Sequence, residues 1–228
     1  MTTNVLFTWS SGKDSALSLH RLRADPNVEV SGLLTTVTEG YDRVSMHGVR
    51  RELLEQQAER TGLPLYLITI PQQCEQEDYE SLMQEALDEQ KTRGVEAVAF
   101  GDIFLEDLRK YREEKLAQVG LPALFPIWKE KTTDLAEELI SSGFVTTITC
   151  ADSEAFAGTG VSAEDIVGRQ LNRSLLADLP DVIDPCGENG EFHSFVHEAP
   201  IFREPIPITV GEKVLRDERF WFCDLVPA

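Results

Sequence analysis

Residues 4–15 read Asn-Val-Leu-Phe-Thr-Trp-Ser-Ser-Gly-Lys-Asp-Ser, and the rest of the chain can be interpreted around them. The apolar run 5–9 predicts a short buried strand, and apolar residues at helical spacing in 16–22 predict a helix. Residues 10–15 must then form the turn between them. Small residues let a backbone approach a ligand closely, and the free N–H groups of a helix start attract anions. The turn therefore predicts a phosphate-binding loop.

Lysine and aspartate give this loop its chemistry. The predicted nucleotide-binding residues are Ser10, Ser11, Gly12, Lys13, Asp14 and Ser15. Lys13 adds a positive charge, whereas Asp14 either caps the helix or helps to hold a magnesium ion that accompanies a polyphosphate. The loop differs from the common phosphate motif Gly-x-x-x-x-Gly-Lys-Ser/Thr, because Phe7 stands at the glycine position and Asp14 at the Ser/Thr position.

Strands and helices alternate as far as about residue 150. The expected strands are 28–37, 65–70, 95–100 and 145–150, and the expected helices are 49–60, 78–93, 104–119 and 133–142. This alternation predicts an α/β fold with a doubly wound parallel sheet. Beyond it, one helix at 163–176 and several short strands predict a small α+β domain. We expect a domain at 1–150 that contains the phosphate-binding loop, and a helical connection with a smaller C-terminal domain at 151–228.

Several polar residues lie where the predicted sheet would bind a ligand, because open parallel sheets bind ligands at the carboxyl ends of their strands. Gly101 and Asp102 directly follow one strand, and Thr35 lies near the end of another, so all three are expected to border the adenosine. His47 precedes a helix and is expected to cap it or to stack on the nucleotide.

Two arginines lie three residues apart on the next predicted helix. Arg109 and Arg112 share one face, where two guanidinium groups could hold phosphate or a substrate carboxylate. The alternative is an ordinary solvent-exposed face with surface ion pairs, which contribute little to stability.

A second dense polar stretch spans residues 184–195. It contains Glu188, Asn189, Gly190, Glu191 and His193. Acid, amide and imidazole groups together can orient an amine, accept its proton or bind a polar substrate. A solvated turn is the alternative interpretation.

Two further patterns are weaker. Cys186, His193 and His197 suggest a metal site, but the sequence offers no fourth ligand and the spacing matches no zinc pattern. Residues 158–163 fit Gly-x-Gly-x-x-Ala, but they lie too far beyond the preceding strand for a dinucleotide site. We interpret them as a flexible loop near the active site.

Composition limits the possible partners. The chain has 228 residues, a formal net charge of -19 and 42% hydrophobic residues, as in a globular protein. The acid excess argues against a DNA or RNA partner. No apolar stretch approaches the roughly 20 residues that a membrane span needs. Four widely separated cysteines and the lack of a secretory signal favour a reduced, cytoplasmic protein. A homodimer is one option for its assembly.

Several separated motifs together resemble the diphthine–ammonia ligase family, which belongs to the PP-loop ATPases (adenine nucleotide alpha hydrolases). The motifs are the loop Ser10–Ser15, with Ser11 at the usual first glycine, Met46-His47, residues 100–103, 109–114, 124–128 and 168–169, and the stretch 184–195. They occur in the family's order and extend over nearly the whole chain.

This resemblance implies a HUP-type domain, ATP and Mg²⁺ as cofactors, and ATP-dependent amide formation from a carboxylate and ammonia. It implies Lys13, Asp14, Glu188, Glu191 and His193 as catalytic residues, with Asp14 near the metal. Substrate binding would involve Arg109, Arg112, Asn189 and Gly190. The family's acceptor is diphthine, a modified histidine on translation elongation factor 2. The family's archaeal and eukaryotic members read Glu-Gly-Gly-Glu-Phe-Glu/Thr, whereas residues 188–193 read Glu-Asn-Gly-Glu-Phe-His, the form of bacterial relatives. This difference affects the expected acceptor and leaves the expected nucleotide chemistry unchanged.

Two other functions use the same loop chemistry. One is tRNA thiolation or lysidine formation, against which the acidic charge and the absence of Cys-x-x-Cys count. The other is a nucleotide-binding sensor without turnover, in which the polar stretch 184–195 would have no purpose.

Overall fold

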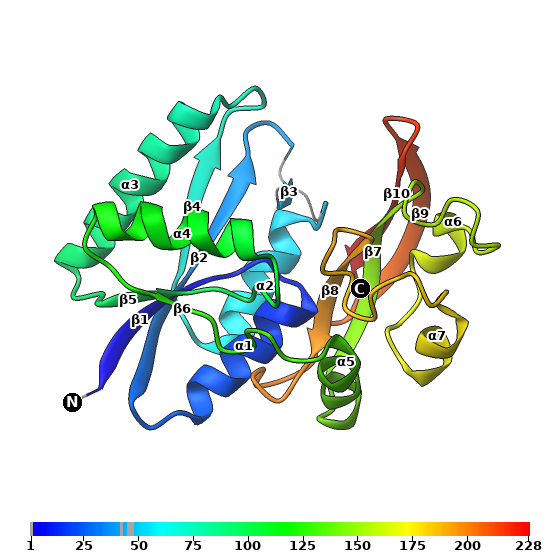
Figure 1. Ribbon diagram of the computed structural model, residues 1–228, viewed down its shortest axis with the longest axis horizontal. Coiled ribbons are helices and arrows are strands. Elements are labelled where there is room, and N and C mark those ends of the chain that lie inside the picture. The colour runs from blue at the N-terminus through cyan, green and yellow to red at the C-terminus, as the bar shows by residue number, and fades with distance from the viewer. Residues whose placement is uncertain (1, 42, 45–47) are drawn as a thin grey trace.

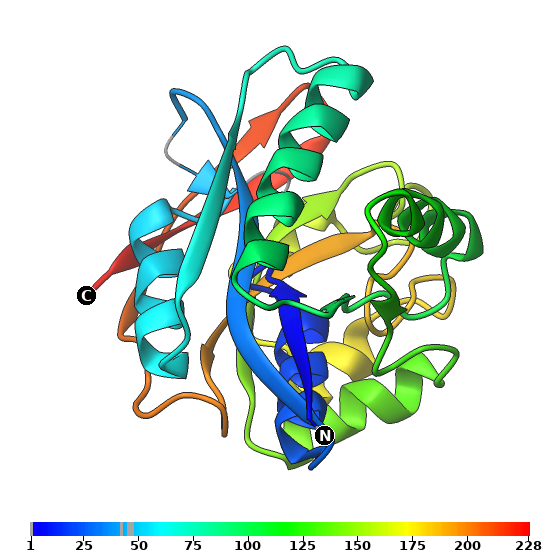
Figure 2. The ribbon, with the colours of Figure 1, turned by 90° about the vertical axis from the view of Figure 1, so that its left-hand side faces the viewer.

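The computed structural model describes residues 2–41, 43–44 and 48–228 (Figure 1). Its first sheet contains β1 (Thr3–Thr8), β2 (Val28–Thr38), β3 (Arg43–Val44), β4 (Leu65–Ile70), β5 (Ala97–Ala99) and β6 (Ala123–Leu124). The parallel strands follow the order β4-β2-β1-β5-β6, and the short β3 pairs antiparallel with the end of β2. Figure 2 shows the blue β1 and β2 beside the cyan β4. The order reverses direction at β1, which confirms the doubly wound fold.

Helices cover both faces of this sheet. They are α1 (Lys13–Ala24), α2 (Arg51–Thr61), α3 (Gln76–Thr92) and α4 (Glu106–Gln118). Leu6 of β1 belongs to the core under α3 and α4, whereas its neighbours Val5 and Phe7 belong to the core with α1 and α2. Because successive side chains of a strand point to opposite faces, a strand covered on both sides must be apolar at every position. This explains the continuous apolar run that begins the chain.

A second, antiparallel sheet lies beyond α1 and α2 (Figure 1). Its strands are β7 (Val145–Asp152), β8 (Phe192–Glu198), β9 (Ile208–Arg216) and β10 (Phe220–Pro227), in the order β8-β7-β10-β9. Three short helices lie beside this sheet in Figure 1: α5 (Thr132–Ser141), α6 (Ala163–Ile166) and α7 (Arg173–Asp178). The expected helix 163–176 is wrong, because Gly168 has φ +81° and separates α6 from α7.

The sheet assignment of residues 145–150 also differs from expectation. They form a strand, but β7 pairs antiparallel with β8 and β10 instead of extending the parallel sheet. The residue pattern of a buried apolar strand does not show which strands it pairs with. The alternation of strands and helices therefore placed residues 145–150 in the wrong sheet. The chain therefore changes sheets between β6 and β7, and we propose a domain boundary there.

The two sheets share one continuous core with α1 and α2 between them (Figure 1). The N–H of Val196 in β8 donates to the carbonyl oxygen of Ser11 at 3.1 Å. A second contact between the two parts of the chain involves β10. There, Arg43 and Arg50 both pair with the carboxylate of Asp224, at 2.9 and 2.5 Å. These contacts place the second sheet directly against the loop between β1 and α1. Among the described residues, no helix is long and apolar enough to span a bilayer.

Candidate active site

A cavity of about 370 Å³ lies at the carboxyl ends of β1, β2 and β5 and extends to the second sheet. From the first sheet and its helices it is lined by Thr8, Trp9, Ser10, Gly12, Lys13, Asp14, Ser15, Leu34, Thr36, Val44, Tyr79, Met83, Gly101, Asp102 and Arg112. From the second unit it is lined by Gly187, Glu188, Gly190, Phe192, His193 and Ser194. The predicted loop and most of the predicted polar stretch therefore meet in one place.

The loop holds an unusual backbone conformation at Ser11. This buried residue has φ +67°, in the left-handed region that favours glycine. Its carbonyl oxygen accepts hydrogen bonds from Val196 N–H at 3.1 Å and from Gln57 Nε2 at 3.0 Å. Gln57 also accepts from Trp9 Nε1 at 2.9 Å and donates to the Val196 carbonyl at 2.6 Å. One buried amide thus fixes the loop to α2 and β8.

At the start of α1, the N–H of Gly12 donates to Ser10 Oγ and the N–H of Lys13 donates to Ser194 Oγ, both at a long 3.3 Å. Gly12 is the N-terminal cap and provides no side-chain hydrogen bond to the first turn. The first N–H groups of a helix have no intrahelical partners and carry partial positive charge. Gly101 packs against this turn so closely that an added Cβ would lie 2.9 Å from Ser15 N and 3.1 Å from Asp14 C. Only glycine fits there without displacing backbone.

Lys13 and Asp14 form an ion pair of 2.8 Å at the cavity wall. The Lys13 side chain is 3% exposed and its ammonium lies 5.2 Å from the Phe192 ring centroid, whereas Asp14 is 24% exposed. Burial acts to lower the pKa of Lys13, but the hydrogen-bonded Asp14 carboxylate, together with Cys186 and Glu188, raises that pKa above its ordinary value. Burial raises the pKa of Asp14, and Lys13 opposes this rise. The lysine therefore remains a cation inside the cavity.

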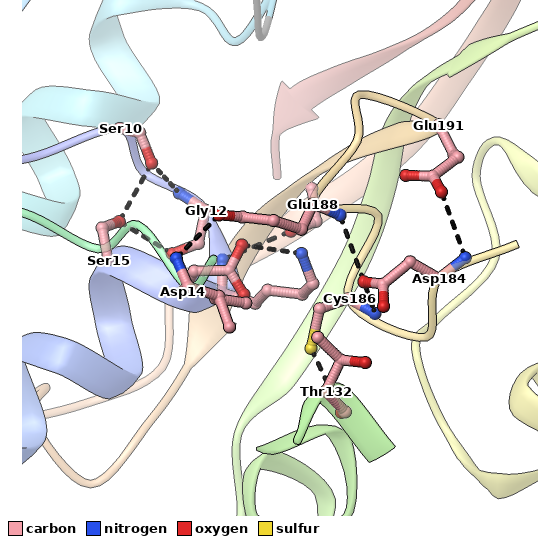
Figure 3. A network of polar contacts seen from close by, with 12 residues as sticks. Ser10, Gly12, Asp14, Ser15, Thr132, Asp184, Cys186, Glu188 and Glu191 are labelled. Carbon is pink, nitrogen blue, oxygen red and sulfur yellow. Dashed lines mark hydrogen bonds and ion pairs between the residues drawn. The ribbon is translucent and has the colours of Figure 1, made fainter. Parts of the chain in front are cut away.

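Glu188 reaches from the second unit to the segment after β5. Its Oε1 accepts hydrogen bonds from the N–H groups of Ile103 at 2.7 Å and Phe104 at 3.3 Å. Burial raises the pKa of Glu188 to about 7, although these N–H groups oppose the rise. The nearby charges of Asp14 and Asp102 raise it further. Figure 3 shows Glu188 together with the loop residues Gly12 and Asp14.

His193 also contributes a side chain to the cavity. Burial lowers the pKa of His193 to about 4, and the positive charge of Lys13 adds to this effect. The imidazole is therefore neutral near pH 7, so it can accept a proton or a hydrogen bond.

The third polar group is a pair at the end of β5. Arg112 Nε lies 2.8 Å from Asp102 Oδ2, and Arg112 Nη2 donates to Asp102 Oδ1 at 3.1 Å. The guanidinium also lies 4.3 Å from the centroid of the Phe100 ring. Burial raises the pKa of Asp102, and Arg112 opposes the rise.

Family models match both parts of the chain. The diphthamide synthase N-terminal domain matches residues 1–123, and the diphthamide synthase C-terminal domain matches residues 131–225. The chain belongs to the diphthamide synthase family. The gap between the two matches falls where the chain passes from the parallel to the antiparallel sheet.

Individual relatives match about 90% of this chain. The chain is 26% identical to diphthine–ammonia ligase of Rattus norvegicus over 234 residues, which covers 90% of this chain and 83% of the relative. It is 25% identical to the Homo sapiens enzyme of the same name over 228 residues, with the same coverage. The Schizosaccharomyces pombe protein of that name is 25% identical over 230 residues, which is 37% of its own length.

Within this diphthamide synthase chain, Glu191 is a loop-forming residue. It is buried, and its carboxylate accepts from Asp184 N at 3.1 Å, from Asn189 N at 2.9 Å and from Asn189 Nδ2 at 2.9 Å. Neither Glu191 nor Asn189 is among the described residues that line the cavity. These bonds hold the loop together, and the catalytic role of Glu191 and the substrate-binding role of Asn189 stay predictions.

Asp184 also holds the loop that carries Glu188. Its Oδ1 accepts from Cys186 N at 2.9 Å and from Glu188 N at 3.2 Å (Figure 3). Sequence reasoning included Asp184 in the polar stretch but assigned it no role. Its position two residues before Cys186 is typical of an aspartate that bonds its own loop, and this pattern could have identified it.

Thr35 does not point into the cavity of this family member. Its hydroxyl donates to the Trp9 carbonyl at 2.7 Å, and its neighbours Leu34 and Thr36 line the cavity instead. Side chains alternate along a strand, so the prediction named the correct strand end but the wrong face. His47 lies outside the described residues.

Arg109 also differs from its predicted role. Its guanidinium lies 4.7 Å from the ring centroids of both Phe125 and Trp128, and its Nε donates to Glu113 at 2.7 Å. It does not line the cavity, whereas Arg112, one turn later, does. Arg109 therefore contributes to packing at the outside of α4.

Sequence reasoning missed the apolar end of the cavity. Tyr79 and Met83 of α3 and Val44 of β3 face Leu34 and Thr36 there. No motif in the sequence marks these residues, because their place depends on how α3 packs over the sheet. Residues 158–163, expected near the active site, do not line the cavity.

The considered zinc ligands have other partners. Cys186 Sγ donates to the Thr132 carbonyl at 3.4 Å, and His197 Nε2 lies 3.2 Å from Thr147 Oγ1. In the described part of the chain, no three His, Cys, Asp or Glu side chains are grouped to hold a metal ion.

Proposed function

We propose that this chain is an ATP-dependent ligase that activates a carboxylate as an acyl-adenylate and converts it to an amide with ammonia. Family membership and the name of its relatives, diphthine–ammonia ligase, support a ligase. The observation that carries the mechanism is the shared cavity. The buried ammonium of Lys13, at the start of α1, and the carboxyl group of Glu188, whose pKa is about 7, line the same cavity.

In the first step, a carboxylate oxygen attacks the α-phosphorus of ATP. The bond from that phosphorus to the bridging oxygen breaks, and pyrophosphate leaves. The N–H groups at the start of α1 and the ammonium of Lys13 stabilise the charge that grows on the leaving pyrophosphate. The apolar end with Leu34 and Met83 holds the adenosine.

Asp14 fits a magnesium ion that arrives with ATP. Its carboxylate is partly exposed to the cavity, and magnesium sites commonly combine one or two carboxylates with phosphate oxygens and water. Asp14 would hold the ion, which would supply charge neutralisation at the phosphates when bound.

In the second step, the ammonia nitrogen attacks the acyl carbon and AMP leaves. Ammonium must first lose a proton, because only the neutral amine has a lone pair. Glu188 accepts that proton most effectively near its pKa of about 7, and neutral His193 can orient the amine. Glu188 releases this first proton to solvent before it accepts the second proton, which the nitrogen loses as the amide forms.

Arg112 positions the acceptor carboxylate at the edge of the cavity. Its planar guanidinium suits a carboxylate, and Asp102 fixes its orientation. The acceptor is a carboxylate-bearing group, which would be diphthine on elongation factor 2 if the relatives' substrate applies.

An oxygen-18 experiment tests the reaction directly. The acceptor, offered with both carboxylate oxygens labelled, should transfer one labelled oxygen to AMP, because the acyl–oxygen bond breaks in the second step. The measurement is mass spectrometry of AMP and amide after incubation with ATP, Mg²⁺ and ammonium. Formation of ADP, or of AMP without label, would contradict adenylation. Bound nucleotide without pyrophosphate release would favour the sensor alternative.

A further inference from the structure

A second cavity of about 300 Å³ lies between α3 and α4. Both helices cover the same face of the parallel sheet (Figure 1). Tyr79, Met83 and Arg112 line this cavity and the nucleotide cavity alike. The two spaces are therefore neighbours with a common wall, and we call the second one the α3–α4 groove.

The groove combines buried apolar residues with polar and charged ones such as Ser81, Gln84 and Gln118. Leu87, Phe100, Leu116 and Val119 line it and are all buried. Protein interiors are normally close-packed, so a space of this size beside a reaction centre is suited to a ligand of similar size. The apolar part of the groove selects a ligand with an apolar body.

The charged groups of the groove pair with each other. Glu80 accepts from Lys115 Nζ at 2.5 Å and from Tyr111 Oη at 3.2 Å, which connects the two helices. Glu77 adds one more acid, and Arg112 is paired with Asp102. Two acids, Glu77 and Glu80, and two bases, Arg112 and Lys115, line the groove, so its lining has no net formal charge to attract a strongly ionic ligand body.

Arg112 stands where the groove meets the nucleotide cavity. Asp102 engages its Nε and Nη2 groups, and a guanidinium has five N–H donors, so donors remain for a second carboxylate. A carboxylate bound there would have its substituent in the groove and its oxygens toward the nucleotide.

We propose that the acceptor is a small carboxylic acid with an apolar body, acyl or aromatic, and that this body occupies the α3–α4 groove. The proposal rests on the ligase function above and specifies its substrate class. The acid enters with its carboxylate at Arg112, and the buried apolar residues bind the remainder.

A series of acids measures the size preference. Acetate, butyrate, hexanoate and phenylacetate are compared as acceptors by pyrophosphate release with ATP, Mg²⁺ and ammonium. We expect kcat/KM to rise by about fourfold for each added methylene, which corresponds to about 0.8 kcal/mol per buried CH₂. A series without any rise would overturn the proposal.

A variant whose groove is filled by a large side chain tests where the apolar body of the acid binds. Gln84 lines the groove from an exposed position on α3, so Gln84→Trp places an indole in it without removing core contacts. Glu85→Trp adds the same side chain at an exposed position outside the groove. We expect Gln84→Trp to lose the preference for longer acids while the KM for ATP is kept, and Glu85→Trp to behave as the parent. An equal rise in the KM for ATP would assign the groove to the nucleotide.

Direct binding separates this proposal from the ligase function. Ligand-observed NMR with phenylacetate, in the presence of a non-hydrolysable ATP analogue, requires no turnover. Binding to the parent and to Glu85→Trp but not to Gln84→Trp, without pyrophosphate release from any acid, would support the groove and refute the ligase. Pyrophosphate release without size preference and without phenylacetate binding would support the ligase and refute the groove.

Discussion

Replacing Glu188 by glutamine should stabilise the protein in a pH-dependent way while impairing amide formation. The pKa of Glu188 is raised from 4.5 to about 7 because the folded protein buries the carboxyl group. Below pH 4.5 the group is neutral in the folded and unfolded chain alike. Between pH 4.5 and 7 the unfolded chain releases a proton that the folded chain retains, so stability falls as the pH rises.

The magnitude follows from the same values. At about 1.4 kcal/mol for each pH unit, the rise to about 7 corresponds to about 3 kcal/mol lost by pH 8. Glutamine has no such titration, and its carbonyl oxygen can still accept from Ile103 N–H. The stability gained by Glu188→Gln should therefore be about 2–3 kcal/mol larger at pH 8 than at pH 5.

Urea unfolding of parent and variant at both pH values measures this difference. Glu188→Ala is the control, because it removes the charge and also the acceptor for Ile103 and Phe104, so it should gain less. Equal effects of Glu188→Gln at pH 5 and pH 8 would refute the burial argument. Undiminished amide formation in the same variant would remove Glu188 from proton transfer.

Four other substitutions, the last with a matched control, test separate parts of the site. Lys13→Ala should lower kcat by about 100-fold or more with a smaller change in ATP affinity, measured by pyrophosphate release and ATP titration; an unchanged kcat would exclude it from the chemistry. Ser11→Gly should raise the melting temperature, because glycine accepts φ +67° at about 1 kcal/mol less cost; a lower melting temperature would mean that the serine hydroxyl matters more. Gly101→Ala should cost about 1–3 kcal/mol in unfolding free energy and raise the KM for ATP, since its Cβ would meet the first turn of α1. Arg112→Ala should raise the KM for the acceptor acid, whereas Arg109→Ala, which does not line the cavity, should leave that KM unchanged in the same steady-state assay.

The loop at residues 10–15 was predictable because strand, turn and helix follow each other within a short segment. Local patterns of this kind carry their own structural reason, namely an apolar run, small residues and a helix start. The sheet assignment of β7 was not predictable in this way, because its partners β8 and β10 lie far away in the sequence. Non-local pairing leaves little trace in the pattern of one strand.

Within the site, the sequence indicated which types of residue are present more readily than which side chains point into the cavity. Arg109 and Arg112 differ by one helical turn, yet only Arg112 faces the cavity. The Thr35 hydroxyl is bonded to the Trp9 carbonyl, whereas its neighbours Leu34 and Thr36 line the cavity. Tyr79 and Met83 carried no sequence signal at all, since the packing of α3 over the sheet brings them to the nucleotide side.

Gln57 has a consequence for how the two lobes hold together. Its buried amide contacts Trp9, Ser11 and Val196 at once, so the phosphate loop and the second sheet share a single anchor. Separating the two lobes would break the bond from Gln57 Nε2 to the Val196 carbonyl and the bond from Val196 N–H to the Ser11 carbonyl, and it would expose the buried amide. The isolated first lobe would keep the bonds of Gln57 to Trp9 and Ser11 but would lose the support that β8 gives to the Ser11 backbone.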